Sequence, residues 1–260
     1  MSNALVITPT IGNRTLVDTV LSVQSQTVDT EHLIVVDGPQ YLDDVLQDLD
    51  KIDKSNINIL TLPYNTGKDN FWGHRIIAGM SQLVNHDYIF LLDDDDWYSN
   101  NHIETMVDTM KSGKLHWAYA LRKIWTFDQS KWIHDYCVSI GDTCNLVSDK
   151  TQVVATSSYG FTNDFFAETG HDWYGGHGAD QRFYREVAKE YEYNCTNLYT
   201  VNYRLDWKNS EEDLALIKLA SGAHEHCKHR PPIKLHQGLP IYNLSHRDSV
   251  LETAPATLEA

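Results

Sequence analysis

Four adjacent aspartates at 93–96 are the strongest chemical feature of the sequence, and they directly follow the apolar segment 88–92. Carboxylates crowded at the end of a buried strand repel one another unless a cation or a basic partner neutralises them. Their oxygen atoms suit Mg²⁺ or Mn²⁺. The alternative is a solvated acidic loop that caps a helix starting near Asn101. The apolar segment before the aspartates, and Trp97 and Tyr98 after them, favour a metal site.

The segments around the aspartates alternate between two patterns. Buried strands are expected at the short apolar runs 5–8, 33–36, 57–62 and 88–92. Helices are expected where apolar residues recur at helical spacing, at 16–23, 41–52 and 76–84. This alternation predicts an α/β fold with a doubly wound, mostly parallel central sheet flanked by helices. Ligands of such sheets bind beyond the carboxyl ends of the strands, where residues 8–10, Asp37 and 93–96 should converge.

The second half of the chain is less regular. A helix is expected at 103–110, a strand at 115–125 and another helix from Asp180 onward, after a stretch rich in glycine and aromatic residues at 160–178. The segment from 221 onward is rich in histidine and proline and has little periodicity, which predicts an irregular tail.

Composition limits the classes of function. The 260 residues are 42% hydrophobic, enough for a proper core, and carry a formal net charge of -15, which disfavours nucleic-acid binding. No run approaches the roughly 18 apolar residues of a membrane span, and the first ten residues do not resemble a signal peptide. For these two reasons we expect a cytoplasmic protein. The four cysteines form no CxxC pair, so we expect reduced thiols.

Several segments together resemble the family 2 glycosyltransferases of the GT-A fold, and their order and spacing are more specific than any one of them. The matching segments are Val6-Ile7-Thr8-Pro9-Thr10-Ile11-Gly12-Asn13-Arg14, Ser22-Val23-Gln24-Ser25-Gln26-Thr27, Val35-Val36-Asp37-Gly38, Asn65-Thr66-Gly67, His74-Arg75 and Leu91-Leu92-Asp93-Asp94-Asp95-Asp96-Trp97-Tyr98. The resemblance covers roughly residues 4 to 210. It implies one catalytic domain at 1–210, with a donor half at about 1–100 and an acceptor half at about 101–210, followed by a C-terminal extension at 211–260.

The resemblance also implies a donor site for a nucleotide-diphosphate sugar, which we expect to be UDP-linked, and a divalent cation, Mn²⁺ or Mg²⁺. The residues implied to bind the nucleotide sugar are Thr8, Pro9, Thr10, Asp37, Arg75, Asp93 and Asp94. Asp93 and Asp95 are the implied metal ligands, and in a strand or turn they can face the same side of the chain. Asp37 and Arg75 also have simpler interpretations, as a turn residue and as a surface helix arginine.

The acceptor side of the implied site lies at 168–185. This stretch resembles the family's aromatic loop before a Glu-Asp pair, but Ala179 replaces the glutamate, so only Asp180 is carried over as the general base for an acceptor hydroxyl. The simpler interpretation of Asp180 is a helix N-cap, which is compatible with catalysis. Aromatic residues that flank the motifs are candidate platforms for a sugar or acceptor: Trp97, Trp173 and Tyr174.

A further departure concerns the metal shell. Many family members have a histidine after a Tyr-Arg segment, whereas this chain has Trp207 or Lys208 at about that place, so a histidine from 224–229 or water and phosphate would complete the shell. We therefore expect a metal-dependent, inverting transfer of a sugar to the hydroxyl of a glycan or other small acceptor. The alternatives are a non-catalytic nucleotide-sugar or glycan-binding protein and, with less support, a nucleotidyltransferase, which would need a basic glycine-rich loop that Thr10 to Arg14 lack.

Overall fold

The computed structural model describes residues 3–127, 129, 131–135, 139–141, 153–205 and 252–253. The first half of the chain builds four parallel strands in the order β3-β2-β1-β4. Their bounds are β1 Ala4–Thr10, β2 Thr30–Val36, β3 Ile57–Thr61 and β4 Tyr88–Leu91. The strands expected from the apolar runs are therefore confirmed, and they form the parallel sheet that the alternation predicted.

The sheet continues beyond β4 with mixed strand directions, so that the described strands form one ten-stranded sheet. Next to β4 runs antiparallel β8, which in turn pairs antiparallel with β6. Along β6 lie parallel β9 and antiparallel β7, while the short strands β5 and β10 pair with β9 and β7. The bounds are β5 Trp97–Tyr98, β6 Trp117–Trp125, β7 Lys131–His134, β8 Tyr159–Thr162, β9 Tyr193–Arg204 and β10 Glu252–Thr253.

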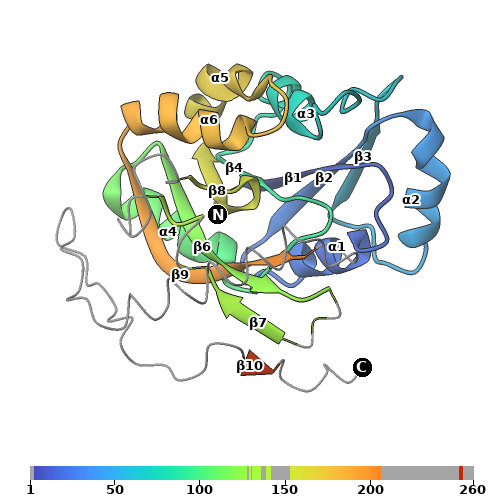
Figure 1. Ribbon diagram of the computed structural model, residues 1–260, viewed down its shortest axis with the longest axis horizontal. Coiled ribbons are helices and arrows are strands. Elements are labelled where there is room, and N and C mark those ends of the chain that lie inside the picture. The colour runs from blue at the N-terminus through green and yellow to red at the C-terminus, as the bar shows by residue number, and fades with distance from the viewer. Residues whose placement is uncertain are drawn as a thin grey trace.

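Helices cover both faces of the sheet (Figure 1). One face packs against α1 (Leu16–Gln24), α2 (Leu42–Asp48) and α4 (His102–Gly113). The other face packs against α3 (His74–Met80), α5 (Asn163–Thr169) and α6 (Ala179–Glu186). Short 3-10 turns join these elements at η1 (Pro39–Tyr41), η3 (Thr156–Ser158), η4 (Gly170–Trp173) and η5 (Ala188–Glu190).

Alternation along the central strands explains why both faces need a helical cover. In β1, Val6 packs toward α1 and α4, whereas its neighbour Ile7 packs toward α3 and α5. In β4, Phe90 likewise packs on the side of α1 and α4, and Leu91 on the side of α3 and α5. Because successive side chains of a strand point to opposite faces, an uninterrupted apolar run has to be buried on both sides. Each such side chain contributes roughly 1.5–3 kcal/mol when it leaves water.

The aromatic stretch at 160–178 contains more regular structure than the sequence indicated, because it holds most of β8, all of α5 and all of η4. The expected helix at 41–52 is shorter, with a 3-10 turn before α2, and the expected helix at 76–84 starts earlier, at His74. The expected C-terminal extension lies outside the described residues except for β10. In the described part of the chain, no helix is both long and apolar enough to cross a membrane.

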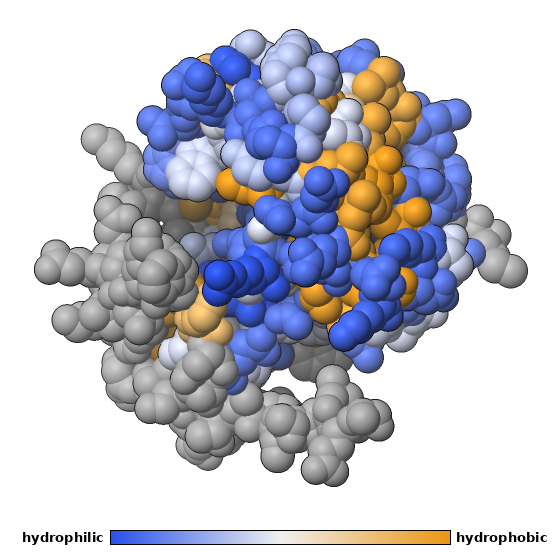
Figure 2. Space-filling model, turned by 90° about the vertical axis from the view of Figure 1, so that its right-hand side faces the viewer, coloured by the Kyte–Doolittle hydropathy of each residue, from blue (hydrophilic) through white to orange (hydrophobic). Residues whose placement is uncertain are grey.

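Figure 2 shows the face that carries α2 and β3, which is mostly hydrophilic but crossed by a band of hydrophobic residues. Exposed apolar side chains on these two elements are Leu46 and Leu60. Among the described strands, β3 is the edge strand of the sheet on this side.

Gly160 allows β8 to pack closely against its neighbours, since a Cβ atom there would lie 2.6 Å from the Phe90 ring and 2.8 Å from Met106. We expect Gly160→Ala to lower the free energy of unfolding by about 1–3 kcal/mol, because it overfills a closed core. Gly79→Ala is the matched control: nothing lies within 4 Å of its Cβ position in α3, so alanine should be neutral or stabilise by up to about 1 kcal/mol. Urea unfolding measures both variants, and equal stabilities would contradict the close packing.

Candidate functional site

The carboxyl ends of β1, β2 and β4 meet at one edge of the sheet, as the sequence predicted. The amide of Leu92 donates to the carbonyl of Ile7 over 3.0 Å, and the amide of Asp37 donates to the carbonyl of Thr10 over 2.9 Å. The aspartates that follow β4 therefore start beside the turn that follows β1.

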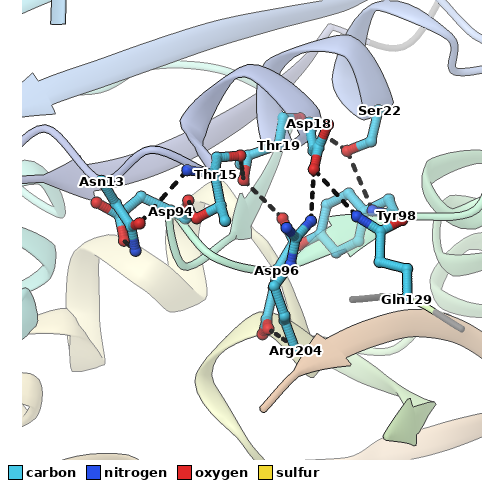
Figure 3. Close-up of polar contacts among 10 residues, drawn as sticks. All are labelled: Asn13, Thr15, Asp18, Thr19, Ser22, Asp94, Asp96, Tyr98, Gln129 and Arg204. Atoms are coloured by element: carbon cyan, nitrogen blue, oxygen red, sulfur yellow. Dashed lines mark hydrogen bonds and ion pairs between the residues drawn. The ribbon is translucent and has the colours of Figure 1, made fainter. Parts of the chain in front are cut away.

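Asp94 is bound by the turn after β1 (Figure 3). Its carboxylate accepts hydrogen bonds from the Thr10 hydroxyl over 2.6 Å and from the Asn13 amide over 3.4 Å, and its carbonyl accepts one from the Thr15 hydroxyl over 3.0 Å. Burial raises the pKa of Asp94, while the bonds from Thr10 and Asn13 oppose this shift. Asp94 therefore joins two loops of the protein, and the hydroxyl of Thr10 is used for that bond.

Asp96 is buried and bound from three sides. Its carboxylate accepts the Ser157 hydroxyl over 2.7 Å and the Arg204 amide over 3.1 Å, and its carbonyl accepts the Thr19 hydroxyl over 2.7 Å. The Arg204 side chain continues across to α1, where it forms an ion pair of 2.5 Å with Asp18 (Figure 3). Burial raises the pKa of Asp96 to about 6, although these partners oppose the shift. Asp96 thus fastens α1, η3 and the end of β9 together.

Asp93 and Asp95 have fewer hydrogen-bond partners than Asp94 and Asp96. The amide of Asp96 donates to the carbonyl of Asp93 over 3.2 Å, so the four aspartates form a turn rather than an extended strand. Their carboxylates therefore do not point alternately to the two faces of the sheet, as they would in a strand. Burial and the charges of the neighbouring aspartates raise the pKa of both Asp93 and Asp95 well above the ordinary value. Among the described residues, the one side chain that donates to the Asp93 carboxylate is the Ser157 hydroxyl, over 3.4 Å, and no side chain donates to that of Asp95. These two carboxylates are crowded and poorly compensated, which fits a cation between them.

The side chain of Asp37 has a structural role that the sequence did not reveal. One carboxylate oxygen accepts the amide and the hydroxyl of Thr66, over 2.6 Å and 2.8 Å, and the other accepts the Gly67 amide over 2.7 Å. Asp37 is almost fully buried. It therefore anchors the loop between β3 and α3, in addition to any role toward a nucleotide.

Arg75 is held by the same loop. Its guanidinium donates to the Thr66 carbonyl over 3.1 Å and lies 3.2 Å from the centre of the Phe71 ring and 5.2 Å from that of Tyr174. Arg75 is thus no free surface arginine, and its proposed contact with a diphosphate stays a prediction.

Two of the expected site residues have buried side chains, and for Trp173 the expectation of a sugar platform is wrong for that reason. The Thr8 hydroxyl is 2.9 Å from Nε2 of His32 inside the protein, so only the backbone of Thr8 can contact a nucleotide. Trp173 is 0% exposed, and its ring stacks on Phe183 at 4.9 Å between centroids, so it cannot offer a face to a sugar. Aromatic residues in a glycine-rich stretch can pack into a core or face a ligand, and their spacing does not separate the two cases.

The other candidate platforms differ in exposure. Tyr174 is 63% exposed and lies beside Phe71, with ring centroids 6.1 Å apart. Trp97 is half-buried between Trp125, at 5.4 Å, and the guanidinium of Arg204, at 5.0 Å. Tyr174 therefore offers the more open ring.

Asp180 lies near the start of α6, on the acceptor side. Its interpretation as an N-cap is wrong, because α6 begins at Ala179 and Gly178 occupies the cap position. Burial raises the pKa of Asp180, while the charges of His74, Arg122 and His177 favour its ionised form. Asp180 is also close enough to Asp93 to raise the pKa of that carboxyl. The structure therefore brings together two carboxylates that are 87 residues apart.

Three contributors to the site were missed by sequence reasoning. Ser157 binds both Asp93 and Asp96, His74 faces Asp180 from the start of α3, and Arg122 forms a buried ion pair of 2.7 Å with Asp135 beside Asp96. His74 stands in one of the matching motifs and could have been found there. Ser157 and Arg122 have no local signal, because their roles depend on the antiparallel strands that bring them to the aspartates.

The described residues do not complete a metal shell by themselves. Among them, no group of three or more His, Cys, Asp or Glu side chains is arranged to hold a metal ion. The histidines at 224–229 and the residues Trp207 and Lys208, considered above for the shell, lie outside the described residues. A cation at Asp93 and Asp95 would thus depend on further oxygen atoms from a ligand or water.

Comparisons with known proteins agree with this architecture. The chain belongs to glycosyl transferase family 2, whose model matches residues 5–157. No curated protein matches the chain in a sequence search. Its fold resembles that of S. aureus TarS residues 1–349, with 13% identity, a TM-score of 0.55 and coverage of 85% of this chain and 65% of that one.

The TarS structure in complex with UDP-GlcNAc is similar to the same degree, with 12% identity, a TM-score of 0.56 and coverage of 85% and 66%. The match to the longer TarS structure covers only 39% of the length of that protein chain. The fold is therefore the mixed α/β GT-A fold expected from the sequence.

The anchoring role of Asp37 can be tested by its removal. We expect Asp37→Ala to lower the free energy of unfolding by about 2–4 kcal/mol, because two half-buried backbone amides and a hydroxyl lose a charged acceptor. Amide exchange should become faster at Thr66 and Gly67. Asp50→Ala, at an exposed position after α2, is the control and should change stability little. Full stability of Asp37→Ala with weaker nucleotide binding would instead make Asp37 a ligand contact only.

Proposed function

We propose that the protein transfers a sugar from a nucleotide-diphosphate sugar to an acceptor hydroxyl. The observation that carries this proposal is the pairing of a crowded aspartate turn with Asp180 across the carboxyl ends of a family 2 sheet. One side of this arrangement suits a diphosphate with its cation, and the other suits a hydroxyl that has to lose a proton. TarS, which has a similar fold, binds UDP and UDP-GlcNAc, and this supports a UDP-linked donor.

The donor would lie over the ends of β1, β2 and β4. Asp93 and Asp95 would hold Mn²⁺ or Mg²⁺, because their carboxylates are crowded and Asp95 has no side-chain donor among the described residues. The cation would supply Lewis-acid stabilisation of the leaving diphosphate. The backbone at Pro9 and Thr10 and the start of the loop at Thr66, which Asp37 binds, would border the nucleoside, since they surround the same edge of the sheet.

Asp180 would act as the general base. Its carboxylate would accept the proton of the acceptor hydroxyl while the oxygen attacks the anomeric carbon from the face opposite the leaving diphosphate, which inverts the configuration. Partial burial raises its affinity for a proton, while His74, Arg122 and His177 keep the ionised form accessible. The hydroxyl of Tyr159 donates to the Asp180 carbonyl over 3.2 Å and helps to fix the start of α6.

A non-catalytic nucleotide-sugar binder is the second candidate, and one observation favours it. Ala179, where the family has a glutamate, is fully buried and leaves Asp180 as the single carboxylate at the start of α6. Release of UDP from a UDP-sugar in the presence of acceptors separates the two functions, because a binder would release none.

Asp180→Asn tests the proposed base. Asparagine keeps the size of the side chain but cannot take the acceptor proton, so we expect kcat to fall by about 10²–10⁴ with donor affinity nearly unchanged. The rate of the parent should also fall as the pH drops through the raised pKa of Asp180, because only the ionised form is a base. The rate of the variant should not show this decrease at low pH. A variant with nearly the parent rate would exclude Asp180 as the base. If the variant fails to bind the donor, the start of α6 has a structural role and Asp180 is not assigned as the base.

Asp95→Asn tests the cation site. We expect UDP affinity measured by calorimetry in Mn²⁺ to fall by about 10- to 100-fold, since a charged ligand of the bridging cation is lost. EDTA should weaken UDP binding to the parent and have little further effect on the variant. Asp108→Asn, at an exposed position on α4, is the control. If neither EDTA nor Asp95→Asn changes the affinity, the protein binds UDP without a metal bridge.

A further inference from the structure

Trp72 is an exposed aromatic residue on a strained loop beside the proposed base. It lies in the segment between β3 and α3, and 60% of its surface is exposed. Its backbone has φ of 51°, and Asp69 and Asn70 just before it also have positive φ, of 63° and 67°. Asparagine and aspartate tolerate the left-handed region, but a bulky side chain rarely occupies it. Such strain is concentrated at functional sites, because the surrounding structure has to impose it.

The surrounding structure does impose it here. The amides of Phe71 and Trp72 both donate to the carbonyl of Gly67, over 3.1 Å and 3.0 Å, and the Gly67 amide is bound by the carboxylate of Asp37. A Cβ atom at Gly67 would lie 2.4 Å from the Trp72 carbonyl oxygen, so the loop closes tightly on itself. The position of Trp72 is therefore set by hydrogen bonds of the loop backbone and not by packing of its own ring.

The loop is also locked to the segment before α6. The rings of Trp72 and His177 lie 6.4 Å apart, and a Cβ atom at Gly176 would lie 3.1 Å from the Asn70 carbonyl oxygen. Arg75, between the rings of Phe71 and Tyr174, joins the same two segments. Two loops from opposite halves of the chain thus contact each other and form one rim.

This rim borders Asp180. His177 lies two residues before Ala179, the first residue of α6, and its charge acts on the Asp180 carboxyl, as does that of His74. His74 in turn follows the loop of Trp72 directly and is buried at the start of α3. Trp72 and His177 are thus two exposed rings of the rim that borders the carboxylate proposed to receive the acceptor proton.

We propose that Trp72 is an acceptor-binding residue, whose ring stacks on the apolar face of a pyranose while His177 hydrogen-bonds a hydroxyl of the same sugar. The proposal rests on the proposed function, since it places the hydroxyl of that sugar at Asp180. A pyranose matches the surface, because it has one apolar face and a rim of hydroxyls. Around Trp72 most exposed neighbours are polar, namely Lys68, Asp69, Asn70 and His177, and Tyr174 is a second exposed aromatic ring of the same rim. A protein partner would need a wider apolar surface than these two rings.

The experiment uses the variants Trp72→Gly and Trp72→Phe in the full chain. Glycine removes the ring and relieves the left-handed strain, so the melting temperature should stay equal or rise. With a UDP-sugar donor and methyl pyranosides of glucose, galactose and N-acetylglucosamine as acceptors, Trp72→Gly should raise the acceptor KM about tenfold, with donor KM and kcat near the parent values. Trp72→Phe should recover part of the loss. Phe127→Ala, which removes another exposed ring, is the control and should leave the acceptor KM unchanged.

Failure of this inference is distinguishable from failure of the proposed function. If the parent transfers sugar and Trp72→Gly keeps its acceptor KM, Trp72 does not bind the acceptor, although the transferase function stands. If the parent transfers no sugar, the proposed function fails, and saturation-transfer NMR with the same methyl pyranosides decides whether Trp72 binds a sugar. Loss of the NMR signal only in Trp72→Gly supports the sugar contact. No signal with the parent, or a change of oligomeric state in the variant, overturns it.

Discussion

Repulsion among the four carboxylates after β4 is the constraint on which the rest of the site depends. Two of the aspartates are compensated by the protein, Asp94 by the turn after β1 and Asp96 by Ser157 and the backbone of Arg204. These bonds fasten β1, η3, α1 and β9 around one turn. The compensation leaves Asp93 and Asp95 with raised pKa values and few donors, so a cation is the partner that suits them best.

The change of strand direction after β4 brings the second half of the site to the first. Because β8 runs antiparallel to both β4 and β6, the chain returns across the sheet and carries Ser157 and Arg122 to the aspartates. The helices that follow β8 then place Asp180 opposite Asp93. A wholly parallel sheet would need a helical crossover at each step and would leave less room for these residues at the same edge.

Rigid loops form the remaining boundary of the site. Asp37 holds the loop that carries Trp72, and this loop meets the glycine-rich segment before α6 through ring contacts and a close backbone approach. The proposed acceptor side therefore consists of residues from both halves of the chain. Pre-formed boundaries of this kind reduce the entropy that has to be lost when a substrate is positioned for reaction.

The sequence by itself determined the parallel strands, the position of the aspartates at the end of β4 and the helix that carries Asp180, because these features follow from patterns within a few residues. Only the tertiary structure decided which side chains are free for ligands. The Thr10 hydroxyl binds Asp94 across 84 residues, Asp37 binds Thr66 across 29, and Trp173 is buried whereas Trp72 is exposed. The physical reason is that burial and hydrogen bonding are properties of residue pairs brought together by the fold, and local periodicity does not record which pairs will meet.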